Sequence, residues 1–156
     1  DTECPFCKRF DTTLKQVMAK YGNQVAWVYR HYPLPMHSKA TKEAEATECA
    51  AEQGGNTAFW RYVDRIFEVS PLNNGLDPNE LPKIAEYIGL NKAKFEACLA
   101  SGKFASKIQA HMQDMNKAGG SGTPFSVIVT PKGNIPVGGA VSFEQIESTI
   151  KSALGK

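Results

Sequence analysis

The sequence predicts an α/β fold that carries a long helical insertion. A β-rich run lies at residues 24–32, helical periodicity alone fills residues 38–118, and β-branched residues return at 125–130 before a closing amphipathic helix. A chain of 156 residues can bury one proper core but not two independent ones. We therefore expect a single domain over residues 1–156, with the insertion at about 38–118.

The first helix is predicted to begin at a Cys-x-x-Cys motif, Cys4-Pro5-Phe6-Cys7. This spacing leaves one thiol, Cys4, exposed at the positive end of the helix dipole and the second thiol one turn further in, so Cys4 has a reason to be a thiolate. Pro5 fits the first turn because its absent N–H would have no partner within the helix. Apolar residues recur at three and four positions and predict a buried stripe that stops near Gly22, made of Phe6, Phe10, Leu14, Val17, Met18 and Tyr21.

Residues 24–32 are predicted to form a strand, because their β-rich run is ended by Pro33 and Pro35. The Pro-x-Pro segment must then be a loop. His31 and His37 lie on either side of it, and either could lie near an active site. The alternative is that each is an ordinary solvated or core histidine.

Residues 38–118 are predicted to hold the helices of the insertion. Alanines flanked by Glu and Lys indicate one helix near residues 40–50, and the apolar spacing of residues 59–67 indicates another. After a loop at 70–76, we expect Asp77 to cap a helix that ends at Gly89, and Asn91 to cap the next one. A last helix, with apolar residues at 104, 108, 112 and 115, is terminated by Gly119.

The end of the chain returns to β structure. Residues 125–130 and 135–137 are predicted to form a hairpin, because residues 131–134 between them are favourable in turns. Ser142 and Gln145 have the spacing of a capping box for the closing helix. Its apolar face is expected to hold Phe143, Ile146, Ile150 and Leu154.

Composition limits the partners that this chain can have. Its 42% apolar and 22% charged residues are typical of a globular domain, and a net charge of +2 gives no electrostatic basis for binding nucleic acid or an anionic membrane. No apolar run approaches the roughly 18 residues of a membrane span, and no signal peptide precedes Asp1. We expect a processed or trimmed chain whose partners are found through its thiol chemistry.

The Cys-x-x-Cys motif has two alternative interpretations. It could be half of a zinc site, but tetrahedral zinc takes ligands in clustered pairs, whereas Cys49 and Cys98 each stand alone. It could be a purely structural disulfide, although so short a loop constrains the unfolded chain little. We therefore expect a redox pair, with no metal and no cofactor.

A second stretch narrows the interpretation. Thr123 and Pro124 lead directly into the run at 125–130, and a proline at a strand entry is a favourable place for a cis bond. With the Cys-Pro-x-Cys helix start, this stretch resembles the DsbA-like thiol:disulfide oxidoreductases of the thioredoxin fold, in which the two motifs face each other. Residues 30–35, 43–55 and 59–67 also resemble this family, so the resemblance covers nearly all of the chain.

The resemblance implies a thioredoxin-like fold with a helical insertion, and a role for each motif residue. Cys4 would bond to the substrate and Cys7 would resolve the mixed disulfide, while Pro5 and Phe6 would contact the substrate together with the backbone of Thr123 and Pro124. The implied partners are proteins with thiols or disulfides and a redox recycling partner, which could be membrane-bound. The implied location is extracytoplasmic, either periplasmic, in the cell envelope or secreted, with the signal segment not present in this chain.

The chain departs from the family pattern at its start. Such folds place a central strand immediately before the Cys-x-x-Cys helix, but only Asp1, Thr2 and Glu3 precede Cys4. Either the strand lies upstream of the sequence given, or the sheet lacks its middle strand and leaves ladder groups unpaired. We expect the first.

The sequence leaves the direction of exchange undecided. Phe6 offers Cys4 neither positive charge nor a hydrogen-bond donor, unlike the histidine of strongly oxidising relatives, and Glu3 adds a carboxylate, whereas Lys8 and Arg9 favour the thiolate. The resemblance favours a disulfide-forming oxidase. The alternatives are an isomerase or reductase of the same fold, and a non-catalytic thioredoxin-like module that binds client chains.

Two further cysteines, Cys49 and Cys98, fall on predicted helices of the insertion. They either pair, closing a loop of about 50 residues, or stay as buried free thiols that act as small apolar side chains. The oxidising compartment that the resemblance implies favours the disulfide.

Overall fold

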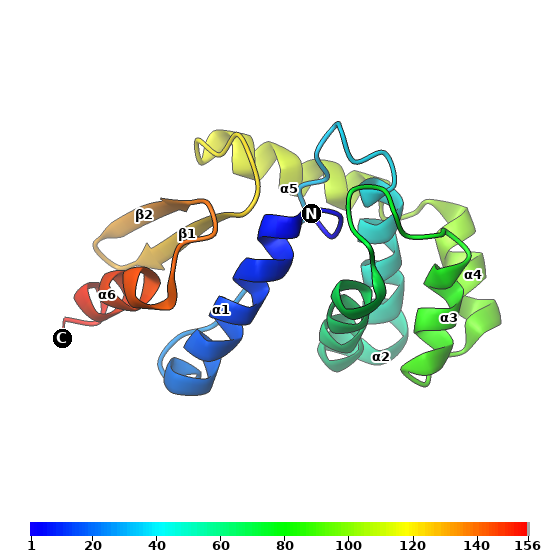
Figure 1. The fold of residues 1–156 in the computed structure, drawn as a ribbon, viewed down its shortest axis with the longest axis horizontal. Helices are drawn as coiled ribbons and strands as arrows, with labels where there is room; N and C mark the ends of the chain where they lie inside the picture. The colour runs from blue at the N-terminus through cyan, green and yellow to red at the C-terminus, as the bar shows by residue number, and fades with distance from the viewer. Residues whose placement is uncertain (156) are drawn as a thin grey trace.

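The computed structural model describes residues 1–155. Its elements follow the order α1 (Pro5–Tyr21), α2 (Ala40–Val69), α3 (Glu80–Tyr87), α4 (Lys92–Ser101), α5 (Ala105–Lys117), β1 (Phe125–Thr130), β2 (Gly133–Gly138) and α6 (Phe143–Ala153). The predicted α/β class with a helical insertion is confirmed, with helices around a small antiparallel sheet (Figure 1).

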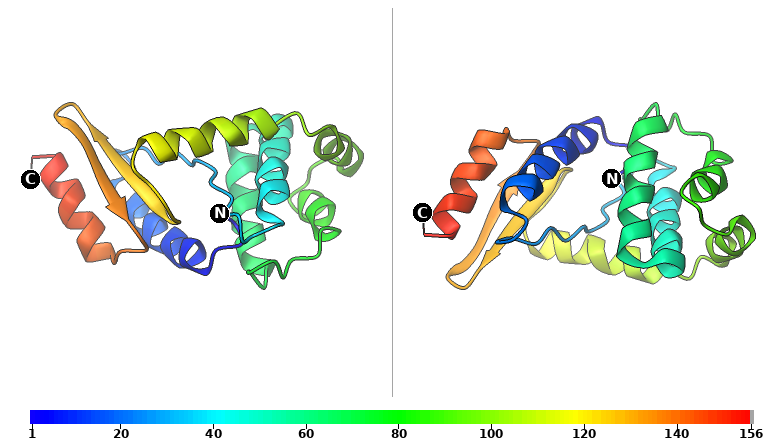
Figure 2. Two further views of the ribbon diagram at one scale, coloured as in Figure 1. Left: turned by 90° about the horizontal axis from the view of Figure 1, so that it is seen from above. Right: turned by 90° about the horizontal axis from the view of Figure 1, so that it is seen from below.

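The chain forms two lobes joined by α5. The hairpin lobe holds α1, β1, β2 and α6, the helical lobe holds α2, α3 and α4, and α5 runs between them (Figure 2). The first described residues lie at the junction of the lobes, so the start of α1 is next to both. The core of the hairpin lobe consists of Phe10, Val17, Tyr21, Ile146 and Ile150.

The hairpin and the closing helix follow the sequence pattern closely. Phe125 pairs with Gly138 and Thr130 with Gly133, so the turn is shorter than predicted and β2 begins before residue 135. In the described chain this antiparallel pair is the whole sheet. The capping box of α6 is present: Gln145 N donates to Ser142 Oγ at 3.3 Å, and Ser142 N donates to Gln145 Oε1 at 3.0 Å.

The prediction of a strand at residues 24–32 is wrong. The segment is extended but belongs to no ladder, because a cavity of about 990 Å³ lies between it, α1 and β1. A strand needs a hydrogen-bonded neighbour as well as β-rich side chains. Its aromatic side chains pack on α2 instead: the ring of Trp27 lies 4.4 Å from that of Trp60.

Helix α1 departs from the predicted stripe at one residue. Phe10, Val17 and Tyr21 are buried and the helix ends at Gly22, as expected, but the Phe6 side chain is 55% exposed. Phe6 lies in the first turn, where its ring packs under the guanidinium of Arg9, with 5.2 Å between the Arg9 Cζ and the ring centroid. The apolar stripe therefore begins one turn later than the sequence pattern indicates.

The helical lobe contains the two predicted helices at residues 40–50 and 59–67 as two parts of α2. Gly55 interrupts them with φ 66° and ψ −158°, a conformation that is essentially restricted to glycine. Asn91 caps α4 as predicted, accepting from Lys94 N at 2.9 Å. The predicted Asp77 cap is wrong, because Asp77 Oδ1 accepts from Asn79 N in a turn and α3 begins only at Glu80.

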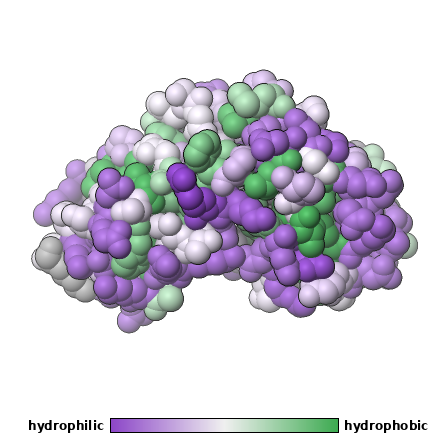
Figure 3. All heavy atoms as spheres, viewed as in Figure 1, coloured by the Kyte–Doolittle hydropathy of each residue, from purple (hydrophilic) through white to green (hydrophobic). Residues whose placement is uncertain are grey.

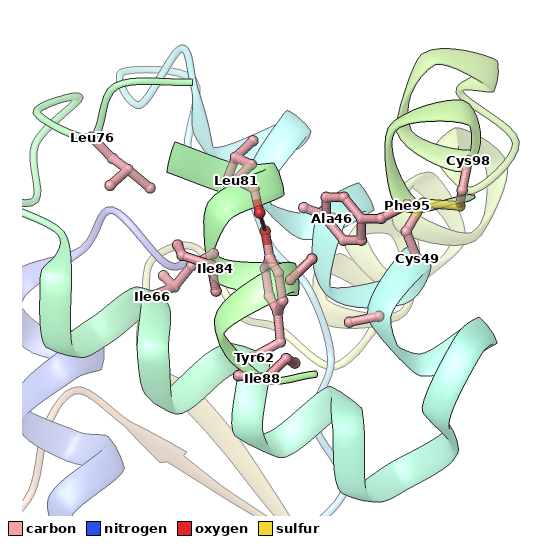
Figure 4. Close-up of a cluster of buried hydrophobic side chains, with 12 residues drawn as sticks. Ala46, Cys49, Tyr62, Ile66, Leu76, Leu81, Ile84, Ile88, Phe95 and Cys98 are labelled. Atoms are coloured by element: carbon pink, nitrogen blue, oxygen red, sulfur yellow. Dashed lines mark hydrogen bonds between the residues drawn. A yellow bond between two sulfur atoms is a disulfide. The ribbon is translucent and has the colours of Figure 1, made fainter. Parts of the chain in front are cut away.

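The core of the helical lobe lies between α2, α3 and α4 (Figure 4). Tyr62 is fully buried, donates its hydroxyl to Leu81 O at 2.9 Å, and stacks on Phe95. Cys49 and Cys98 form a disulfide at the edge of this core, with their Cα atoms 5.9 Å apart (Figure 4). The bond ties α2 to α4.

The surface is mostly hydrophilic on the face shown in Figure 3, and apolar side chains reach it in both lobes. Within the described chain, no helix is long and apolar enough to cross a membrane.

Candidate active site

The Cys-x-x-Cys motif lies at the junction of the two lobes. Cys4 is the N-cap of α1, with φ −85° and ψ 120°, and Pro5 follows in the first turn. The Cys4 carbonyl accepts from the backbone N–H groups of Cys7 at 3.0 Å and Lys8 at 3.1 Å, so the helix starts directly at the motif. Both cysteines are free thiols.

Cys4 lies beneath the loop that precedes β1. Its Sγ lies 3.6 Å from the carbonyl oxygen of Thr123, and the Thr123–Pro124 peptide bond is cis. Only 3% of Cys4 is exposed, so the expectation of an exposed thiol at the helix end is wrong. The rest of the motif is more accessible, because Phe6 projects into solvent and Cys7 is half-buried.

The two thiols have very different acidities. A hydrogen bond from the Cys7 side chain is the main cause that lowers the pKa of Cys4 from 9.0 to about 5, with further lowering by Thr123 and by backbone N–H groups, against the effect of burial. The same hydrogen bond, together with burial, raises the pKa of Cys7 far above its ordinary value. Near neutral pH the motif therefore holds a Cys4 thiolate and a protonated Cys7.

The hydroxyl of Thr123 adds a donor beside this sulfur. Thr123 Oγ1 is buried, and apart from its effect on the Cys4 sulfur it has no hydrogen-bond partner among residues 1–155. A buried hydroxyl without a partner is costly, so a group that accepts its proton at this place gains a hydrogen bond that is otherwise missing.

The family of the chain can be decided from its match to known sequences. A family model described as thioredoxin matches residues 1–152. This chain belongs to the thioredoxin family. Within it, the chain is similar to the crystal structure of Pseudomonas aeruginosa DsbA2, with a TM-score of 0.83 and 32% identity over 97% of this chain and 83% of that one.

Other similar proteins support the thioredoxin fold or match a short part of a longer chain. Bacillus subtilis BdbD has a TM-score of 0.80 at 19% identity, over 100% of this chain and 84% of that one. The Na(+)/H(+) antiporter NhaA 3 of Salinispora tropica is 34% identical over 125 residues, which are 80% of this chain and 18% of the antiporter. This chain thus spans about a fifth of the length of the antiporters that it matches.

The residues that precede the motif hold this thioredoxin-family site in place, a role that the sequence pattern does not indicate. Asp1 Oδ1 accepts from Glu3 N at 2.8 Å, while Asp1 Oδ2 accepts from Leu34 N at 2.7 Å and lies 2.8 Å from His37 Nδ1. His37 therefore lies close to the motif, as one of the two sequence hypotheses allowed. His31 lies instead against Glu48, at 3.1 Å.

A pair of carboxyl groups is buried beside the motif. Glu3 and Glu43 are 0% and 1% exposed, Thr2 Oγ1 donates to Glu43 Oε2 at 2.6 Å, and Asn74 N donates to Glu3 Oε2. The Oε1 atom of each has no hydrogen-bond partner in the described part of the chain. Burial and the neighbouring Glu3 raise the pKa of Glu43 to about 8, so the pair holds a proton near neutral pH.

The sequence pattern did not reveal this pair. The glutamates at 43, 45 and 48 belong to the helix that the alanine-rich pattern predicts near residues 40–50, and all three are buried. Nothing in helical periodicity distinguishes a buried, protonated glutamate from an exposed one. The only local signal is the density of alanine around them, which lets neighbouring segments approach the helix closely.

Replacing Glu43 by glutamine should remove a loss of stability at alkaline pH. The folded pKa of Glu43 lies above the unfolded value, so its stabilising contribution is complete below about pH 4.5 and is lost as pH rises through 8. Glutamine imitates the protonated form. We expect Glu43→Gln to unfold with a higher free energy than the wild type at pH 8, by more than about 1 kcal/mol.

The measurement is denaturant unfolding of the oxidised protein between pH 5 and about 9, so that the Cys4 thiolate does not contribute. Glu52→Gln is the matched control, because Glu52 is on the same helix but exposed, paired with Lys103. Its pH dependence should follow that of the wild type. An unchanged slope in Glu43→Gln would show that Glu43 is ionised in the folded protein.

Proposed function

We propose that this chain catalyses thiol–disulfide exchange with protein substrates, most favourably as a disulfide-forming oxidase. The observation that carries the proposal is the difference in acidity within the motif, with Cys4 at a pKa of about 5 and Cys7 far above the ordinary value. Such a difference makes the Cys4 thiolate the nucleophile and leaving group, and keeps Cys7 protonated until it reacts as the second thiol. A cysteine pair that performs no exchange would gain nothing from this difference in pKa.

The reaction follows from these two sulfurs. In the oxidised enzyme, a substrate thiolate attacks Cys4 Sγ, the Cys4–Cys7 bond breaks, and Cys7 leaves and takes up a proton. A second substrate thiolate then attacks the substrate sulfur of the mixed disulfide and expels Cys4 as a thiolate. The substrate loses two electrons and two thiol protons, and the enzyme gains the electrons.

The exposed side of the motif is suited to contact a polypeptide. The Phe6 ring lies in solvent two residues after Cys4, and Arg9 stacks on it. Thr123 and Pro124 close the other side, and Thr123 O contacts the Cys4 sulfur. In the proposed complex Pro5 and Phe6 form an apolar contact with the substrate, and the backbone of 123–124 aligns it.

The low pKa of Cys4 favours oxidation over reduction. A stabilised thiolate makes the dithiol form of the enzyme favourable, so its disulfide is a stronger oxidant. An isomerase or reductase of the same fold would hold its thiolate less strongly. A client-binding module would need no acidic thiol, so the acidity of Cys4 also argues against that alternative.

The reduction potential of the Cys4 and Cys7 pair tests this proposal. Equilibration with glutathione should give a potential less negative than about −180 mV, because an oxidising dithiol lies above that value and thioredoxin lies near −270 mV. In the same samples, oxidised enzyme should form disulfides in a reduced, unfolded substrate protein. Cys4→Ser should abolish this, whereas Cys98→Ala should not.

Other outcomes point to the alternatives. A potential near that of thioredoxin, with substrate disulfides reduced, would favour a reductase. A pair that does not exchange with glutathione, in a protein that still binds unfolded chains, would favour the binding module.

The disulfide Cys49–Cys98 supports an extracytoplasmic location, because such bonds persist in oxidising compartments. We propose a periplasmic, cell-envelope or secreted protein. An oxidase that turns over must itself be reoxidised, so the proposal includes a recycling partner that accepts two electrons from Cys4 and Cys7. A membrane-bound oxidant would fit this role.

A further inference from the structure

A cluster of buried metal-ligating side chains contains none of the residues of the cysteine motif. It contains His31 from the extended segment, Glu48 from α2 and His111 from α5, which are 3%, 4% and 7% exposed. His31 Nε2 lies 3.1 Å from Glu48 Oε1, and the two imidazole rings are stacked with centroids 5.6 Å apart. One ligand atom from each residue lies within 4.8 Å of the others.

The protonation states of these groups suit metal binding. Burial is the main cause that lowers the pKa of His31, and it lowers that of His111 to about 4, so both rings are neutral and each has a nitrogen lone pair. Burial opposes ionisation of Glu48, but hydrogen bonds from His31 and Lys107 outweigh it and lower its pKa. The cluster therefore offers two imidazoles and one carboxylate near neutral pH.

The neutral tautomers can be deduced from the hydrogen bonds. His111 Nδ1 accepts the backbone N–H of His31 at 3.3 Å, so its lone pair is on Nδ1. This is a long hydrogen bond and is readily exchanged for a stronger ligand. His31 Nε2 lies between Glu48 Oε1 and Thr47 Oγ1, at 3.1 and 3.2 Å, and donates its proton there; coordination through Nε2 moves that proton to Nδ1.

A second cavity gives the cluster an approach route. It has a volume of about 440 Å³, and its lining includes Glu48, His111 and Lys107 together with the exposed Val28 and Asn56. There is room for water molecules to complete a coordination sphere. Lys107 Nζ holds the second oxygen of Glu48 at 2.6 Å and is about half exposed, so it can move aside or stay while Oε1 binds.

We propose that His31, Glu48 and His111 bind one divalent transition-metal ion, of which zinc is the reference. Two imidazole nitrogens and one carboxylate oxygen are a ligand set that zinc accepts, with a fourth position left for water. Bonds of about 2.0–2.2 Å place tetrahedral donors roughly 3.4 Å apart. His31 Nε2 and Glu48 Oε1, at 3.1 Å, are already near that spacing, and the other donor separations, which are within 4.8 Å, must shorten. Side-chain rotation supplies such movements. No local sequence pattern indicates this site, because Glu48 and His111 lie 17 and 80 residues from His31.

The alternative is a purely structural network, in which Lys107 already neutralises Glu48. The two interpretations differ in what Lys107 does. In a structural network its removal leaves a buried carboxylate without its cation and is only destabilising. In a metal site Lys107 competes with the ion for Glu48, so its removal favours metal binding.

Zinc titration of the full chain carrying Cys4→Ser and Cys7→Ser tests the proposal, because these changes remove the free thiols as competing ligands. Isothermal titration calorimetry should show a single zinc ion bound. Glu48→Gln and His111→Asn should weaken binding by more than about 100-fold, since each removes a direct ligand while keeping a hydrogen-bonding side chain. Lys107→Met should bind zinc at least as tightly.

His37→Asn is the matched control, because His37 is the one other histidine of the sequence and is also buried. It should leave the zinc affinity unchanged. Circular dichroism establishes that each variant is folded, and NMR of the parent chain, in which zinc should shift the ring signals of His31 and His111 but not of His37, gives a result that needs no variant. Absence of zinc binding by the parent, or binding that survives both ligand substitutions, would overturn the proposal.

Discussion

Reduction of the Cys49–Cys98 disulfide should lower the free energy of unfolding by about 4 kcal/mol. The cysteines are 49 residues apart in sequence. Closing a loop of this length lowers the conformational entropy of the unfolded chain, and this loss corresponds to about 4 kcal/mol of stability. Reduction should change the folded state little, because packing between α2 and α4 holds both cysteines in place. Most of the effect therefore arises in the unfolded ensemble.

The Cys4→Ser/Cys7→Ser variant isolates this effect, since a reductant then breaks only one bond. Denaturant unfolding with and without the reductant should shift the midpoint downward and increase the slope, as the freed chain exposes more surface. The same reductant added to a Cys49→Ala/Cys98→Ala derivative of this variant should change nothing. A loss below about 1 kcal/mol would mean that the unfolded chain stays compact around residues 49–98.

The active-site pair should have the opposite effect near neutral pH, with the dithiol form more stable than the disulfide form. Cys4 has a folded pKa of about 5 against 9.0 for an ordinary thiol. A lowered pKa gives a stabilisation that is complete above the unfolded value and is lost as pH falls through 5. At pH 7 it contributes roughly 3 kcal/mol, whereas closing a loop of four residues contributes about 2 kcal/mol.

The stabilisation by the Cys4 thiolate and the stabilisation by the disulfide loop are expected to be equal at about pH 6. Below this pH the oxidised form should be the more stable. Unfolding should be measured in a Cys49→Ala/Cys98→Ala background, so that reduction affects Cys4 and Cys7 alone. Cys4→Ser in that background should lose the pH dependence that Cys4 contributes. If the oxidised protein is the more stable at pH 7, Cys4 is not strongly acidified, and the reductase or structural interpretation gains over the oxidase.

Much of the fold could be predicted because its signals are local. The start of α1 at Pro5, its end at Gly22, the cap at Asn91 and the capping box at Ser142 each depend on a few neighbouring residues, and each is where the sequence placed it. The strand at 24–32 failed because strand formation depends on a partner elsewhere in the chain. Asp77 failed because its side chain can stabilise a turn as readily as a helix start.

The candidate site was predicted only where spacing carries the chemistry. Cys4, Cys7, Thr123 and Pro124 belong to two short motifs, and the structure brings Cys4 to Thr123 across more than a hundred residues. The exposure of Cys4 was wrongly predicted because the covering loop is distant in sequence. The Glu3–Glu43 pair and the His31 cluster were missed for the same reason: each joins polar residues from separate segments, with no pattern within any one of them.

The position of the Cys49–Cys98 bond also bears on how the proposed exchange catalyst avoids acting on its own disulfide. Thiolate attack on a disulfide needs an open line to one of its sulfurs. Here Cys49 and Cys98 are only 1% and 7% exposed, and Ala46, Tyr62 and Phe95 belong to the same packed cluster. A reactive Cys4 thiolate, on this molecule or on a neighbouring copy, therefore cannot reach the structural bond without local unfolding. Packing within this cluster thus protects the structural bond from disulfide scrambling, whereas the exposed Phe6 and the half-buried Cys7 leave the motif open on one side for the proposed exchange.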